Sequence, residues 1–212
     1  MAQSASEITQ GREMNTIDGM WDRMYEYWKI HEPSFVDCNG INDEEILSFE
    51  QSLQLKLPND LKKSLKRCNA YPSEPQKVVS SSCCMTGGSG HLFSLETIAS
   101  WYKDFNEYMY DGCTYEHIDP KLTPKDIIWS HEWLPIYSWN CDVIALLDLR
   151  KGIGEQYEQV LYLDQEYSTL GVWAKSYEEF LKLIADAIVD HGAFNRNDME
   201  KVRQKVYNTT RN

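Results

Sequence analysis

Apolar residues recur at helical spacing in three stretches of the first third of the chain. The first stretch covers residues 16–31 and ends before Pro33, because the residue that precedes a proline disfavours helical geometry. The second covers residues 42–53 and starts with an asparagine followed three residues later by a glutamate, an approximate capping box. The third covers residues 59–67 directly after a proline. These patterns predict three amphipathic helices.

The rest of the chain alternates between one more helical pattern and short apolar runs. Residues 94–105 have helical spacing after a serine that can cap a helix. Three short apolar runs with short connections follow, at residues 133–137, 143–149 and 160–163, and they favour an antiparallel meander. An S-x-x-E capping box then opens a helix over residues 176–191.

The length of 212 residues and a hydrophobic content of 42% indicate one domain with a packed core. Residues 1–15 are polar and without periodicity, so we expect a flexible leader. Residues 16–192 form the predicted domain. Residues 193–212 are predicted to be a basic tail or a short helix, since five basic and two acidic side chains follow Asn195.

Charge narrows the range of partners. The chain carries 33 acidic and 21 basic side chains, a net charge of -12. Such a surface repels phosphate, so nucleic acids and anionic membranes are not expected partners, whereas a basic protein is. The sequence shows no secretory signal pattern and no apolar run of transmembrane length, and we therefore expect a cytoplasmic location.

Side chains that could perform chemistry do not form a recognisable motif. The six cysteines are scattered through a chain too large to need a disulfide framework, so free thiols are expected. No C-x-x-C or H-E-x-x-H spacing supports a zinc site. The glycines at residues 87–90 lack the lysine of a phosphate-binding loop, and a pair of Cys83 or Cys84 with His91 lacks a third orienting group. We predict no catalytic, cofactor-binding or metal-binding residues.

Several short motifs occur in an order typical of one family. They are Ile46, Phe49, Glu50 and Leu53, then Leu55-x-Leu57-Pro58-x-Asp60-Leu61, Trp133-x-Pro135-Ile136, Leu147-Asp148, and Ser176 to Leu181. Together they resemble the SUKH superfamily over about residues 41–190. This group contains fungal Smi/Knr-type cell-wall regulators and many bacterial immunity proteins. With the element order, the resemblance implies an α+β fold, in which a twisted, mostly antiparallel sheet is flanked by N-terminal and C-terminal helices.

The negative charge is concentrated in residues 101–149, which hold nine acidic and three basic side chains and many aromatic ones. This stretch is either a solvated acidic face or a docking surface, because aromatic anchors within a charged rim are typical of protein interfaces. The residues that we expect to contact a partner are Asp104, Glu107, Tyr110, Asp111, Glu116, Asp119, Glu132, Trp139 and Asp142.

The resemblance implies a protein-binding role without enzymatic activity. Since nuclease toxins are basic on their substrate face, the acidity favours an immunity protein that neutralises such a toxin. One alternative is a regulatory scaffold of the Smi/Knr type, which would bind signalling proteins. A second alternative is an enzyme that acts on a small molecule, which would require a pocket with converging histidine and carboxylate groups.

Overall fold

The computed structural model describes residues 15–33, 35, 37–69, 90–108, 115–119, 122, 129–140, 142–151 and 158–210. The elements are α2 (Ile17–His31), α3 (Asp43–Leu53), α4 (Asn59–Arg67), β1 (Gly90–Leu92), α5 (Leu95–Tyr108), β2 (His117–Ile118), β3 (Trp133–Trp139), β4 (Val143–Asp148), β5 (Val160–Asp164), β6 (Thr169–Ala174), α6 (Tyr177–His191) and α7 (Arg196–Thr210). None of the helices in these ranges is long and apolar enough to cross a membrane.

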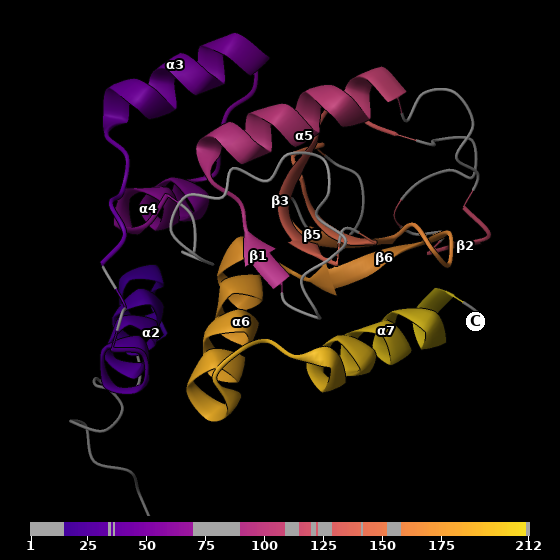
Figure 1. Ribbon diagram of the computed structural model, residues 1–212. Helices are drawn as coiled ribbons and strands as arrows, with labels where there is room; N and C mark the ends of the chain where they lie inside the picture. Colours follow the sequence, from indigo (N-terminus) through magenta and orange to yellow (C-terminus); the bar gives the residue numbers. More distant parts are fainter. Residues whose placement is uncertain are drawn as a thin grey trace, which may run out of the picture.

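The strands form one sheet in the order β1-β3-β4-β5-β6-β2, counted over the described residues. Strands β3 to β6 are a consecutive antiparallel meander, β1 adds antiparallel to β3, and β2 adds parallel to β6. In Figure 1, α5 lies on one side of the sheet and α6 and α7 lie on the other. The predicted α+β fold with a mostly antiparallel sheet and flanking helices is confirmed.

Both faces of the sheet are buried, and strand β4 shows why its sequence is apolar throughout. Val143, Ala145 and Leu147 belong to the core beneath α2, α4, α6 and α7, whereas Ile144 and Leu146 belong to a second cluster that includes Phe105 from α5. Because side chains alternate between the faces of a strand, a strand covered on both sides needs apolar residues at every position.

A junction between α3 and α4 is organised around one buried carboxylate. Helix α3 ends at Gln54, whose positive φ of 57° turns the chain. The Glu50 carboxylate, on a residue only 5% exposed, then accepts hydrogen bonds from the Leu57 amide at 2.8 Å and from Lys56 at 3.1 Å, and pairs with Lys62 at 2.6 Å. Burial raises the pKa of Glu50, but these bonds outweigh burial and leave the pKa below its ordinary value.

A buried serine connects three helices. Ser64 of α4 is 2% exposed, and its Oγ accepts a hydrogen bond from Trp21 Nε1 of α2 at 2.9 Å. The Tyr177 hydroxyl at the start of α6 donates to the same oxygen at 2.8 Å. Since buried polar groups need partners, this hydroxyl fixes the positions of two large side chains at once.

The expectation of free thiols is wrong for two of the six cysteines. Cys38 and Cys68 form a disulfide with a Cα to Cα distance of 5.3 Å. It connects the segment before α3 to the C-terminal end of α4, where Asn69 N also donates to Asn39 O at 3.0 Å. The two cysteines are 30 positions apart along the sequence, and the packing of α4 against this segment brings them together. Cys83 and Cys84 lie outside the described residues.

Candidate functional site

The residues predicted to contact a partner do not share one environment. Asp104, Glu107, Glu116, Glu132 and Asp142 are exposed. Asp119 and Trp139 are each only 5% exposed, so neither offers a surface to a partner. Trp139 packs against Phe194 of the α6–α7 loop, with ring centroids 6.0 Å apart. Tyr110 and Asp111 lie outside the described residues.

One group of the predicted acids lies along α5 and the segment before β3. Asn106 of α5 accepts a hydrogen bond from Trp129 Nε1 at 2.7 Å, and its Oδ1 lies 2.6 Å from His131 Nδ1. The Tyr102 hydroxyl donates to the His131 carbonyl at 2.7 Å. These hydrogen bonds join α5 to the segment before β3, where exposed Asp104, Glu107 and Glu132 lie. Among the described residues, this part of the surface has no exposed large aromatic side chain.

A second group lies at the opposite end of β3, where the chain turns between strands. Glu132 and Asp142 flank the ends of this seven-residue strand, so roughly 20 Å separates them. Asp142 O accepts from Gln165 N at 2.8 Å, which joins the β3–β4 turn to the β5–β6 turn. Ser168 O of the β5–β6 turn accepts from Glu116 N at 2.9 Å. Exposed Asp142, Glu116 and Glu166 therefore gather at one end of the sheet.

The same end of the sheet presents an aromatic side chain that sequence reasoning missed. Tyr167 is 45% exposed, and its amide donates to the buried Asp164 carboxylate at 3.1 Å, which fixes the turn. The guanidinium of Arg203 lies 4.7 Å from the centre of the Tyr167 ring, and Arg203 also pairs with Asp164 at 3.2 Å. Tyr207 of α7 lies edge-on to Tyr167, with ring centroids 6.3 Å apart.

We call the surface formed by Glu116, Asp142, Glu166 and Tyr167 the acidic turn surface. It has three exposed carboxylates and one exposed ring at the same end of the sheet. The Asp164 turn fixes the position of the ring, and the Arg203 guanidinium lies 4.7 Å from its centre. An aromatic anchor within a charged rim is the arrangement that protein interfaces use. The surface therefore presents negative charge beside an exposed aromatic side chain.

The buried charges that lie away from this surface serve the fold. Asp148 and Arg150 are 1% and 4% exposed and form a bidentate pair, with Nε to Oδ1 and Nη2 to Oδ2 distances of 2.8 Å. The guanidinium also donates to the Leu122 carbonyl at 3.0 Å and lies 4.8 Å from the Trp133 ring centre. Within the part of the chain that the structure describes, no three His, Cys, Asp or Glu residues come together as metal ligands.

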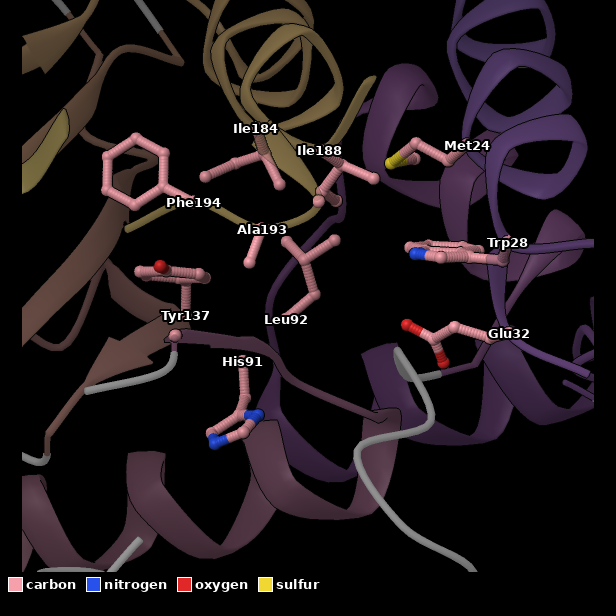
Figure 2. Close-up of a pocket in the computed structure, with 12 residues that line it drawn as sticks. Met24, Trp28, Glu32, His91, Leu92, Tyr137, Ile184, Ile188, Ala193 and Phe194 are labelled. Atoms are coloured by element: carbon pink, nitrogen blue, oxygen red, sulfur yellow. The ribbon is translucent and has the colours of Figure 1, made fainter. Parts of the chain in front are cut away.

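A cavity of about 170 Å³ lies between α2, the C-terminal end of α6, the α6–α7 loop and β1. Figure 2 shows its two ends: Tyr137 and Phe194 lie on one side, and Trp28 and Glu32 lie on the other, with Leu92 between them. His91 lines the cavity as well, and burial lowers the pKa of its imidazole, so the ring is neutral at pH 7. No sequence motif marks these residues as a group, because they come from four separate parts of the chain.

Among known proteins, one family model matches a large part of the chain. No curated protein matches the chain significantly. The model of the SMI1/KNR4 family (SUKH-1) matches residues 40–183, from the segment before α3 into α6. This range covers more than half of the chain and includes the α3–α4 junction and the β3–β6 meander, and the chain therefore belongs to the SMI1/KNR4 family (SUKH-1).

Proposed function

We propose that this protein is a non-enzymatic, protein-binding domain that acts as a cytosolic immunity protein and neutralises a basic toxin. The SUKH family is generally non-enzymatic, which supports a binding role. The observation that carries the proposal is the acidic turn surface, where Tyr167 is exposed at the same end of the sheet as three exposed carboxylates.

The charge of this surface suits a partner that binds nucleic acid. A nuclease toxin must be basic where it holds phosphate, and an acidic inhibitor can cover that face. Opposite charges also steer the encounter, which raises the association rate constant of the inhibitor with the toxin. Tyr167 then supplies buried contact area at the centre, because aromatic side chains dominate the energetics of such interfaces.

The proposal is tested by protection of cells. The proposal predicts that a basic toxin domain is encoded beside this protein in the genome, and that domain is expressed from an inducible promoter. We expect co-expressed wild-type protein to restore growth. The triple variant Glu116→Lys, Asp142→Lys and Glu166→Lys should fail to do so, although it folds normally by circular dichroism.

The matched control reverses three acids on the other surface, with Asp104→Lys, Glu107→Lys and Glu132→Lys. These side chains are also exposed but lie along α5 and before β3, so this variant should still protect. Loss of protection in the control alone would contradict docking through the acidic turn surface. Binding without protection by the wild-type protein would instead favour the regulatory scaffold of the Smi/Knr type.

A further inference from the structure

The C-terminal helix α7 brings a positive charge to the acidic turn surface. The guanidinium carbon of Arg203 lies 4.7 Å from the centre of the Tyr167 ring, and Nη2 of Arg203 lies 3.2 Å from the Asp164 carboxylate. A positive charge at this place weakens the attraction of the surface for a basic partner. Attraction of the partner therefore does not explain why Arg203 stands beneath the surface.

A buried network holds the guanidinium in place. Asp164 is 0% exposed and accepts a hydrogen bond from the Tyr162 hydroxyl at 2.6 Å. Nε of Arg203 donates to that hydroxyl oxygen and to the Asp164 carboxylate, both at 3.3 Å. Burial, and next the hydrogen bond to Asp164, raises the pKa of Tyr162, so this hydroxyl keeps its proton and remains a donor. Since charge-assisted hydrogen bonds between buried groups are strong, the guanidinium has one defined position.

The same network determines where the Tyr167 ring lies. The Tyr167 amide donates to the second oxygen of Asp164 at 3.1 Å, so one carboxylate connects the β5–β6 turn to Arg203. A guanidinium within about 6 Å of a ring centre is attracted to the ring. Tyr207, four residues after Arg203 on α7, meets Tyr167 edge-on, with ring centroids 6.3 Å apart. Helix α7 therefore contacts the exposed ring with two side chains that lie one helical turn apart.

Helix α7 is firmly packed and lies outside the family match. It packs against β6 and β2 (Figure 1), and its Met199 and Val206 are only 2% and 1% exposed. Lys205 Nζ also donates to the Trp173 carbonyl of β6 at 3.4 Å. The family model ends its match at residue 183, before α7 begins. The side chains with which α7 holds Tyr167 therefore come from a part of the chain that the match does not cover.

We propose that α7 is a specificity element of the acidic turn surface, in which Arg203 is a positioning residue that holds the Tyr167 ring in the orientation that a partner contacts. This inference rests on the proposed function of that surface. A side chain that is fixed before binding loses less conformational entropy when the complex forms, so the complex dissociates more slowly.

The first measurement needs no partner. Arg203→Lys keeps the charge beside Asp164 but removes the flat guanidinium that stacks on Tyr167. We expect the aromatic NMR resonances of the Tyr167 ring, assigned by comparison with Tyr167→Phe, to move toward those of a free tyrosine side chain. The matched control is Arg23→Lys, because Arg23 on α2 pairs with Asp186 on α6 at 2.8 Å, and it should leave these resonances in place. Tyr167 resonances that Arg203→Lys does not move would overturn the proposal, whether or not a toxin binds.

The second measurement separates positioning from attraction by the kinetics of binding to the proposed toxin. Arg203→Lys leaves the net charge unchanged, so the association rate constant should stay within about twofold of the wild type. The dissociation rate constant should rise about fivefold, and Arg23→Lys should change neither constant. In a Tyr167→Ala background, Arg203→Lys should have no further effect on dissociation.

Arg203→Met gives the sharpest contrast, because it makes the surface more negative. Attraction alone predicts that this variant binds the toxin more tightly, whereas loss of positioning predicts faster dissociation without slower association. Arg203→Lys decides the question if Arg203→Met does not fold. An unchanged dissociation rate constant in Arg203→Lys would overturn the proposal. If the wild type does not bind the toxin, the proposed function is wrong, and the Tyr167 resonances still decide whether Arg203 holds the ring.

Discussion

Replacing Ser64 with alanine should destabilise the protein far more than the loss of one hydroxyl suggests. Ser64 Oγ accepts hydrogen bonds from Trp21 Nε1 and from the Tyr177 hydroxyl, and all three groups are buried. The Ser64→Ala variant leaves both donors without an acceptor. Since each buried unsatisfied donor costs about 1–3 kcal/mol, we expect the free energy of unfolding to fall by about 2–5 kcal/mol.

The loss is measured by urea unfolding followed by tryptophan fluorescence. Adding Tyr177→Phe to Ser64→Ala removes one of the two orphaned donors, so the double variant should be as stable as Ser64→Ala or more stable. Tyr177→Phe alone should cost about 1 kcal/mol. The control is Ser100→Ala on the exposed side of α5, which should change stability by less than about 0.5 kcal/mol. If Ser64→Ala costs no more than this control, the reasoning about the buried serine is refuted.

Two further predictions concern stability. Removing the disulfide with Cys38→Ser and Cys68→Ser should lower the free energy of unfolding by about 3.6 kcal/mol, because the unfolded chain regains the loop-closure entropy of the 30-residue separation. The urea midpoints measured with and without reductant should differ for the wild type and should be the same for the variant. Equal midpoints for the wild type would contradict the bond. Because the pKa of Glu50 is lowered in the folded protein, its carboxylate stabilises the fold at pH values above the unfolded-state pKa. This stabilisation is lost as the pH falls through the folded-state pKa. Between about pH 5 and pH 3 the wild type should therefore lose more stability in urea titrations than Glu50→Gln, and parallel losses would disprove this linkage.

Local sequence signals predicted the elements that depend on local interactions. The helix that begins after Asn42 was predicted from its capping box, and the structure shows both bonds of that box: the Asn42 side chain accepts from the Glu45 amide at 2.9 Å, and the Glu45 carboxylate accepts from the Asn42 amide at 2.8 Å. Strands β1, β2 and β6 were not predicted. Strand β2 has two residues and exists because it pairs with β6, and β6 has a glycine in its middle, so neither has a pattern of its own.

The site was predicted less well, because exposure depends on contacts between distant segments. Trp139 and Tyr167 are both aromatic residues near turns, and nothing local distinguishes them. Trp139 is buried because Phe194 from the α6–α7 loop packs against it, whereas Tyr167 remains 45% exposed above the buried Asp164. The pairing of Cys38 with Cys68 is non-local in the same way.

The central claim is the proposal that the acidic turn surface docks a basic toxin, and the rate of association with the proposed toxin tests it most directly. Stopped-flow fluorescence would measure the association rate constant at low and high ionic strength for the wild type and for the variant with lysine at Glu116, Asp142 and Glu166. Docking through the acidic turn surface predicts that the wild-type rate falls steeply as salt rises and that the variant associates at least about tenfold more slowly at low salt. A wild-type rate that is independent of salt and equal to that of the variant would contradict the account.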